Sequence, residues 1–596
     1  MAYEKPDRRV ARRAAVTARP FALSPVLILL AALAGCENWN WRIPPPEPAP
    51  PPKATLSDDI LTAGTVGAET VVANVDVQPL RGFGLVVGLN GHGSSDCPTV
   101  IRDYLIDHLS KEFGPQADPQ RRNLLSPSEL LDSLDTAVVQ ITGIVPAGAR
   151  QGHRFDLEVH AIPGTSTQSL EGGLLLPTQM RYFNVAASGQ GLVEGTVLAE
   201  GGGPLITNVP PGGGNNAADS EFRHGYVLGG GRALEERPSR LMLLRPNYQL
   251  ARTIERRINE RFGQKPRTAE AVSAGYIELH TPPTLMRYPQ RFRELVAQLC
   301  LDNRPTATEQ KLRELARAAI AEGANLERIA ITWEAMGRSV IAHIQPFYTH
   351  ADPVLCYYAA RTGLRLGDLT ALPVLAAAAA PGSALQLPAI SELGDCESPQ
   401  APPYLAPALN DSDAAVRIAA YEALLHRGDP AIQAVTFPHR LDQAQINFVL
   451  DIVQSEGTPL IYVRRTRLPR IAVFGGRAAL TPPVFYTDPD DSVTVHTVDG
   501  SDDVQLFAKQ KGRMSEQLVM PPRVVELIKA LADLPLRNEA GRLRGIGLPY
   551  SNVVEVLAAL SRDGAIPAPL VYEQIGVAAP PEITPERPEG ERPEHE

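Results

Sequence analysis

The sequence predicts an α+β protein, in which a mixed α/β body is interrupted by an all-α region. Strand-like alternation and helical spacing occur together from residue 60 to about 300. From about 302 to 447 strand patterns vanish and Ala and Leu dominate, and strand patterns return after 458. The 596 residues are 44% hydrophobic, which is too apolar for a wholly disordered chain and enough for several cores. We therefore expect several folded parts.

Residues 1–35 have the composition of a secretory signal. The apolar run 21–34, FALSPVLILLAALA, is too short to span a bilayer comfortably but suits a signal peptide. It ends in Leu33-Ala34-Gly35-Cys36, which resembles the bacterial lipobox and implies cleavage before a lipidated Cys36. The run follows six basic and two acidic residues: Lys5, Arg8, Arg9, Arg12, Arg13 and Arg19 against Glu4 and Asp7.

Residues 36–59 are predicted to be a linker and 579–596 a disordered Pro/Glu tail. Within the linker, 42–53 read RIPPPEPAPPPK, which favours a stiff polyproline II spacer. Acyl chains on Cys36 would hold the protein to a membrane in the periplasm or cell envelope. The net charge is −10 for the whole chain and −14 without residues 1–35, so nucleic acid is not an expected partner.

Residues 60–302 are predicted to form an N-terminal α/β domain. Strand alternation marks 137–141 and 155–160, while 98–113 and 250–262 have helical spacing. Two glycine clusters, 201–203 and 212–214, are expected to bracket a loop.

Residues 303–447 are predicted to form a stacked helical array. Three segments, 352–368, 383–395 and 412–429, each end in Gly-Asp, and a helix often ends at a glycine with left-handed backbone. The segment 411–430, DSDAAVRIAAYEALLHRGDP, resembles a HEAT repeat. Its expected buried stripe is Val416, Ala419, Ala420, Ala423 and Leu424.

Residues 448–578 are predicted to be a C-terminal α/β part. Strand 493–498, a turn at Asp499-Gly500 and strand 504–507 suggest a hairpin. Helices are expected at 521–534 and 551–562, the second with Ser551 as N-cap and Gly564 beyond its end.

The sharpest motif is GFGLVVGLNGHG at 82–93. Three residues separate its second and third glycines, one more than in a dinucleotide fingerprint, and an apolar run stands where a phosphate-binding helix should begin. The pattern instead predicts a short buried strand, 85–89, framed by glycines that allow positive φ and close backbone approach. We therefore expect a structural motif without a cofactor, formed by Gly82, Phe83, Gly84, Leu85, Val86, Val87, Gly88, Leu89, Asn90, Gly91 and Gly93.

This string also resembles the opening of the bacterial flagellar P-ring protein family, with His92 for the usual Thr and Ser94 for the usual Asp. Segments 136–162 and 169–178 resemble later parts of the family, and 547–565 resembles its closing helix. There are three departures. The lipobox and the helical region are not usual in the family, and no segment like its Asn-Glu-Arg-Thr-Gly-Thr strand precedes Ile471.

The resemblance implies a structural subunit of the flagellar basal body. Such a subunit would self-assemble as a homo-oligomeric P ring around the rod in the periplasm and support motility. Its implied partners are rod proteins, the L-ring protein and peptidoglycan. An alternative is an envelope lipoprotein scaffold unrelated to motility, whose HEAT-like repeats bind a protein partner.

No catalytic motif is present in the sequence, and we expect no enzyme activity. His153, Asp156 and His160 are the best metal-ligand candidates, but strand alternation places Asp156 and His160 on one face with Arg154 and Glu158. A solvated strand face accounts for that set, so no metal site is predicted. In an oxidising compartment four cysteines are open to disulfide pairing or to packing as small hydrophobes: Cys97, Cys300, Cys356 and Cys396.

Overall fold

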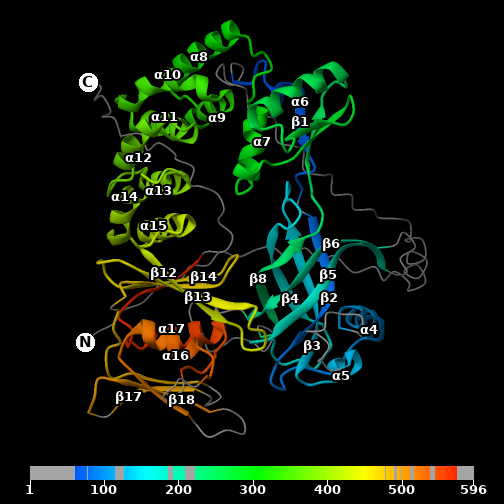
Figure 1. The fold of residues 1–596 in the computed structure, drawn as a ribbon, viewed down its shortest axis with the longest axis vertical. Coiled ribbons are helices and arrows are strands. Elements are labelled where there is room, and N and C mark those ends of the chain that lie inside the picture. The colour runs from blue at the N-terminus through cyan, green and yellow to red at the C-terminus, as the bar shows by residue number, and fades with distance from the viewer. Residues whose placement is uncertain are drawn as a thin grey trace, which may run out of the picture. The chain divides into compact units, whose positions relative to one another are not determined.

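The computed structural model describes residues 61–76, 78–113, 126–185, 192–207, 222–476, 478–488, 493–498, 500–509, 516–536 and 544–573. The predicted signal peptide, Cys36, the proline-rich linker and the Pro/Glu tail lie outside these ranges. Figure 1 shows the described elements as an α+β body in which helices separate two groups of strands along the chain.

The first group of strands forms a seven-stranded sheet with the order β4-β3-β2-β5-β6-β8-β7. Strand β4 also pairs with β8, so the sheet closes on itself. Alternate residues of each strand point into the core of this closed sheet, among them Val139, Leu157 and Val227. The strands are β2 (Gln78–Val87), β3 (Thr136–Val145), β4 (Arg154–Ala161), β5 (Leu174–Val185), β6 (Leu192–Pro204), β7 (Ile206–Thr207) and β8 (His224–Ala233).

Two helices, α4 (Thr99–Phe113) and α5 (Pro127–Leu131), pack their apolar residues against β2 and β3 in a separate small core. The predictions for 98–113, 137–141 and 155–160 are therefore confirmed. Residues 201–203, the first of the two glycine clusters, belong to β6. Residues 208–211 of the stretch between the clusters lie outside the described residues, so the loop there stays a prediction. Gly201 lies where a Cβ would come within 2.7 Å of Leu157 Cδ1, so pairing and close packing hold it in the sheet. The second cluster, 212–214, lies outside the described residues.

A smaller four-stranded sheet has the order β1-β9-β11-β10 and is covered by helices. Helix α6 matches the prediction for 250–262, with the Asn247 side chain accepting from the first free amides. The elements are α3 (Val66–Glu69), β1 (Thr70–Ala73), β9 (Ser239–Leu243), α6 (Tyr248–Phe262), β10 (Ala269–Ala271), β11 (Tyr276–Leu279), η2 (Pro283–Leu285) and α7 (Pro289–Ala297).

Residues 305–427 are helical, and helices that follow one another along the chain pack together (Figure 1). The helices are α8 (Pro305–Ala319), α9 (Leu326–Met336), α10 (Ile341–Ile344), α11 (Pro353–Arg365), α12 (Leu372–Ala378), α13 (Gln386–Asp395), α14 (Pro402–Leu405) and α15 (Ala414–Arg427). Short 3₁₀ turns connect some of them: η3 (Arg338–Val340), η4 (Gln345–Thr349), η5 (Leu369–Ala371) and η6 (Ala406–Asn410).

The glycines of this helical region differ in role. Gly367 (φ 87°) and Gly428 (φ 63°) follow helix ends with positive φ, as predicted. Gly394 instead lies inside α13, where a Cβ would stand 2.6 Å from Ala423 Cβ of α15. It therefore permits two helices to approach closely. Of the predicted stripe, Val416, Ala420, Ala423 and Leu424 are buried and Ala419 is half-buried.

The helical region ends earlier than predicted, at Arg427, because β12 (Ile432–Pro438) and the start of β13 (Ile446–Val453) are strands. These strands belong to a sheet with the order β12-β13-β15-β14-β20. One face of it shares a core with the helices, through Val453, Tyr462 and Phe474 among others. Strand β12 pairs antiparallel with β13, the next strand along the chain, and this hairpin ends the helical region. The other strands are β14 (Leu460–Arg464), β15 (Arg470–Phe474) and β20 (Leu570–Tyr572).

The opposite face of that sheet packs on α16 (Val524–Ala532), α17 (Tyr550–Arg562) and a four-stranded antiparallel sheet. The predicted hairpin is confirmed as β17 and β18, with Gly500 at φ 76° between them. Ser551 does not cap α17, because the helix begins one residue earlier, at Tyr550. The side chain of Asn447, which comes from another part of the chain, accepts the Tyr550 amide at 3.1 Å. The strands are β16 (Phe485–Thr487), β17 (Val493–Thr497), β18 (Val504–Ala508) and β19 (Glu516–Met520).

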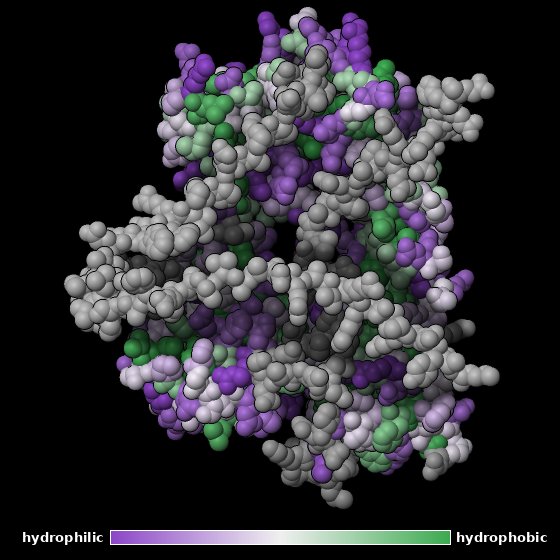
Figure 2. All heavy atoms as spheres, turned by 180° about the vertical axis from the view of Figure 1, so that it is seen from behind, coloured by the Kyte–Doolittle hydropathy of each residue, from purple (hydrophilic) through white to green (hydrophobic). Residues whose placement is uncertain are grey.

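Hydrophilic and hydrophobic residues are interspersed over the face of the molecule seen in Figure 2. Within the part of the chain that the structure describes, no helix combines the length and the apolar character needed to cross a membrane.

Candidate functional site

The glycine motif begins inside β2, which pairs with β3 on one side and β5 on the other. A Cβ on Gly82 would lie 2.4 Å from the carbonyl oxygen of Gln179, and one on Gly84 would lie 2.3 Å from Thr178 Oγ1. The β2–β5 register shifts between Arg81 and Val86. These two glycines therefore allow β5 to approach β2 where the pairing is irregular. The observed strand extends from 78 to 87, longer at its start than the predicted 85–89 and two residues shorter at its end.

The motif continues into a turn whose backbone amides are hydrogen-bonded to residues at the start of β3. Gly88, Asn90 and Gly91 have φ values of 81°, 54° and 92°. The amides of Leu89, Gly93 and Ser94 donate to the carbonyl oxygens of Asp135, Leu134 and Thr136, at 3.0, 2.9 and 2.8 Å. A Cβ on Gly93 would lie 2.1 Å from the Thr136 oxygen. These amide groups are thus bonded to the start of β3, whereas a phosphate-binding turn presents its amides to a ligand.

His92 connects the motif to the segment 169–178, the second part of the chain with a family resemblance. Its carbonyl oxygen accepts from the amides of Gln168 and Ser169 at 2.9 and 3.3 Å, and its Nδ1 lies 3.3 Å from Gln168 Oε1. Nearby, Asp96 accepts from the amide and hydroxyl of Ser166, and these bonds hold the pKa of the exposed Asp96 carboxyl below its usual range.

The turn also meets the C-terminal part of the chain. A Cβ on Gly88 would lie 2.1 Å from Leu441 Cδ1, and the Arg440 guanidinium donates to Asn90 Oδ1 at 3.3 Å. Next to it, a Cβ on Gly172 would lie 2.9 Å from Pro549 Cγ. The three stretches 82–93, 169–178 and 547–565 therefore border one cleft.

This cleft has a volume of about 630 Å³ and mixed charge. The charged or titratable residues that line it include His92, Glu171, His439, Arg440, Asp488, Lys509 and Glu555. Burial, reinforced by the charge of Asp488, raises the pKa of Glu555, and burial lowers the pKa of His439. The lining carries both signs of charge, unlike the positive surface expected of a nucleic-acid site.

The outward face of β4 is divided between two environments. Asp156 is half-buried and accepts the Gly229 amide at 2.5 Å, and burial raises the pKa of its carboxyl. Burial together with the charge of Arg467 lowers the pKa of His153. Arg467 belongs to the loop between β14 and β15, so this end of the strand face is covered rather than solvated, contrary to expectation.

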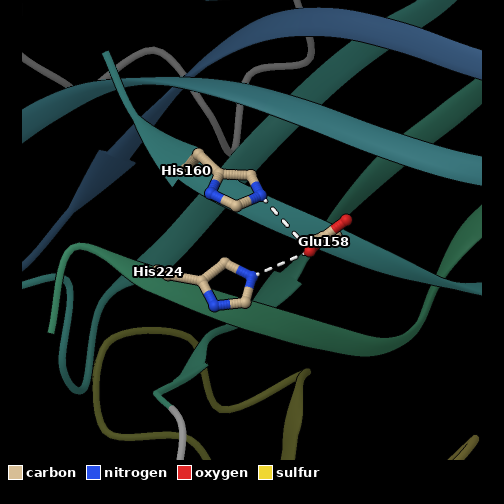
Figure 3. A group of neighbouring side chains, drawn as sticks. All are labelled: Glu158, His160 and His224. Carbon is tan, nitrogen blue, oxygen red and sulfur yellow. Dashed lines mark hydrogen bonds and ion pairs between the residues drawn. The ribbon is translucent and has the colours of Figure 1, made fainter. Parts of the chain in front are cut away.

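The other end of the β4 face is more exposed and brings together Glu158, His160 and His224 (Figure 3). His160 was a predicted candidate and Glu158 was placed on its face, but His224 was missed. His224 is the cross-strand partner of His160 on β8, and nothing local in the sequence indicates the β4–β8 register. His153 and Asp156 are not part of this cluster.

The four described cysteines are free thiols: Cys97, Cys300, Cys356 and Cys396. All four are half-buried, which agrees with packing as small hydrophobes rather than pairing. Burial raises the pKa of the Cys300 thiol, as it does for Cys97 and Cys356, and this disfavours the reactive thiolate.

Comparison with known proteins gives a match to the family model for flagellar P-ring protein over residues 69–311. The flagellar P-ring protein of Pseudomonas entomophila (strain L48) is 31% identical over 223 residues, which are 35% of this chain and 54% of that protein. The protein of the same name from Pseudomonas fluorescens (strain Pf0-1) is 30% identical over 219 residues, 35% of this chain and 56% of the relative. Flagellar P-ring protein 1 of Photobacterium profundum is 29% identical over 240 residues, 37% and 58% of the two chains.

Residues 69–311, the P-ring region, are similar to this family. The chain spans a little over half the length of these curated relatives. The P-ring region contains the closed sheet, the glycine turn and the small four-stranded sheet. Most of the helices between 305 and 427, and the C-terminal wall of the cleft, lie beyond the match.

Proposed function

We propose that this protein is a structural subunit of the flagellar basal-body P ring, which assembles from copies of itself around the rod in the periplasm and supports motility. The observation that carries the proposal is the family match over 69–311, within which the glycine turn uses its amides for packing. A ring of identical subunits needs two different complementary faces on each copy. Rod proteins, the L-ring protein and peptidoglycan are the proposed neighbours of the ring.

The proposed role needs rigid packing and no chemistry. Support comes from the cleft, where the P-ring region is joined to the C-terminal part through the close contacts of Gly88 with Leu441 and of Gly172 with Pro549. Such contacts would make the two parts move as one body during assembly. The proposal therefore assigns these glycines to packing within the subunit rather than to a ligand.

The test is electron microscopy of basal bodies isolated from cells that produce a tagged copy of the protein. We expect label on the P ring, and a deletion strain should lose that ring and its swimming in soft agar. Basal bodies with complete P rings in the deletion strain would contradict the proposal. Gly91→Ala serves as a mild control variant: its Cβ meets nothing within 4 Å, and the cost of its positive φ, about 1–2 kcal/mol, should leave ring assembly intact.

We also propose that Cys36 is lipidated and anchors the protein, with the proline-rich linker as spacer. The support is the lipobox-like Leu33-Ala34-Gly35-Cys36 after an apolar signal-like run. Metabolic labelling with a fatty acid should mark the wild type and leave Cys36→Ser unlabelled. Equal labelling of Cys97→Ser and the wild type is the matched control, and a labelled Cys36→Ser protein would refute the anchor.

A second candidate function is an envelope scaffold that recruits a protein partner through the helical region. The observation that favours it is that most of 305–427 lies beyond the family match. Deleting the helical region would expose one face of the sheet β12-β13-β15-β14-β20, because that face and the helices share a core. We therefore favour substituting its exposed apolar residues Leu369, Leu387 and Tyr404 by Ser, with Val519→Ser on β19 as control. Loss of a specific co-purifying partner with normal rings would support the scaffold, whereas unchanged partners and rings would exclude it.

A further inference from the structure

The geometry points to a metal site formed by Glu158, His160 and His224, which would bind one divalent transition-metal ion of the zinc class. Two imidazoles and one carboxylate are a ligand set that Zn²⁺ uses in proteins, with the remaining position taken by water or substrate. The site lies inside the P-ring region but does not depend on the ring proposal.

Strand register places the three ligands. Glu158 and His160 are two residues apart on β4, so they point to the same face. His224 on β8 is paired directly with His160, and Ala161 donates its amide to the Arg223 oxygen at 2.9 Å beside them. The three side chains therefore come from a paired backbone rather than from a loop, which fixes their spacing before any ion binds.

The donor atoms have the separations that a small ion requires. His160 Nε2 lies 3.3 Å and His224 Nε2 lies 3.0 Å from the same oxygen, Glu158 Oε1. All three ligand atoms lie within 4.8 Å of one another. Ligands at ~2.0–2.2 Å from a tetrahedral ion are about 3.3–3.6 Å apart. Small rotamer adjustments would therefore bring all three donors to one ion, and Figure 3 shows both rings turned toward the carboxylate.

The surroundings suit an ion with an open coordination position. The side chains of His160 and Glu158 are 46% and 43% exposed and that of His224 is 21% exposed, so an ion can enter and keep water. The two rings stack with centroids 4.2 Å apart, and both Nε2 atoms approach the same carboxylate oxygen, Glu158 Oε1. An ion here would tie β4 to β8 at the pairing that closes the seven-stranded sheet. Because the ligands converge only in the folded sheet, binding would stabilise the closed form.

Without a metal ion the same contacts are a hydrogen bond from His224 and an ion pair of His160 with Glu158, so the test separates the two cases. Purified protein is treated with a chelator, and Zn²⁺ is then titrated by calorimetry, with Co²⁺ absorption as a second readout of the ligand set. We expect one Zn²⁺ per chain and a Zn²⁺-dependent rise in the unfolding temperature. Glu158→Gln keeps an oxygen that accepts the hydrogen bond from His224 but removes the charged ligand. His224→Gln removes a nitrogen ligand.

Each of these two variants should weaken Zn²⁺ binding more than ~10-fold, because loss of a residue that only hydrogen-bonds to a metal ligand already costs about that much. The matched control is His280→Gln, because His280 Nδ1 lies 3.1 Å from Glu236 Oε1 in a pair with a single histidine. That variant should bind Zn²⁺ as the wild type does. If His224→Gln fails to fold, the exposed Glu158→Gln decides the question. The proposal is overturned if the wild type takes up no stoichiometric Zn²⁺, or if Glu158→Gln binds it as tightly as the wild type.

Discussion

Two glycines of the same turn, Gly91 and Gly93, should respond very differently to alanine. Gly93 has an ordinary φ but no room, since a Cβ would lie 2.1 Å from the Thr136 carbonyl oxygen, closer than the 3.0 Å that real side chains keep. Gly91 has φ 92° but open space, with nothing within 4 Å of a Cβ. Gly93→Ala therefore tests packing, and Gly91→Ala tests backbone conformation.

The magnitudes follow from what each methyl group must displace. Gly91→Ala forces a left-handed backbone on an L-residue, which costs about 1–2 kcal/mol. Gly93→Ala must push β3 away from the turn, which costs about 1–3 kcal/mol by overpacking. It also strains the bonds from Gly93 to Leu134 and from Ser94 to Thr136, worth about 0.5–1.5 kcal/mol each. We expect about 2–6 kcal/mol for Gly93→Ala.

The assay is urea unfolding followed by far-ultraviolet circular dichroism, with hydrogen exchange of peptides from β3 measured by mass spectrometry. Gly93→Ala should lower the unfolding free energy more than Gly91→Ala and should speed exchange in 134–145. Gly91→Ala should leave exchange in β3 near the wild-type rate. A Gly93→Ala protein at least as stable as Gly91→Ala would refute the packing role assigned to this turn.

Three further predictions concern other parts of the molecule. Asp451 is fully buried and bonded to Arg470 at 2.8 Å, so Asp451→Ala should lower the unfolding free energy by about 3–5 kcal/mol in urea titrations, because it leaves the largely buried Arg470 cation unpaired. Hydrogen bonds from Ser166 lower the pKa of Asp96 below its usual 3.8. The stability that ionised Asp96 contributes is therefore fully present above that pH and is lost as the pH falls through the pKa of the folded state. Ser166→Ala should reduce the drop in unfolding temperature between pH 5 and pH 2. Unfolding the protein without reductant should make Cys97, Cys300, Cys356 and Cys396 reactive to maleimide, as read by mass spectrometry of their peptides, and an unlabelled pair among these four would reveal a disulfide.

Much of the fold was predictable because its signals are local. Alternation identified β3 and β4, helical spacing identified α4 and α6, and a turn between two alternating runs identified the hairpin of β17 and β18. The P-ring resemblance rested on short strings of residues and agrees with the family match over 69–311. Each of these inferences needs only residues close together in the chain.

The errors arose where a distant part of the chain supplies the deciding contact. Ser551 looks like an N-cap, but Asn447 accepts the amide at the start of α17. Gly394 looks like a helix-ending glycine with left-handed backbone, but it is helical within α13, and Ala423 of α15 leaves no room for a Cβ there. Local patterns carry no information about these partners.

The sequence alone determined the helical and strand periods, the glycines of the turn at 88–93 and the strings that place 69–311 in its family, because these depend on neighbours along the chain. The tertiary structure decided the β4–β8 register, which sets His224 opposite His160 and beside Glu158. It also decided that 82–93, 169–178 and 547–565 border one cleft. The physical reason is that register and close approach arise from the packing of whole sheets, where a shift of one residue turns every side chain to the other face.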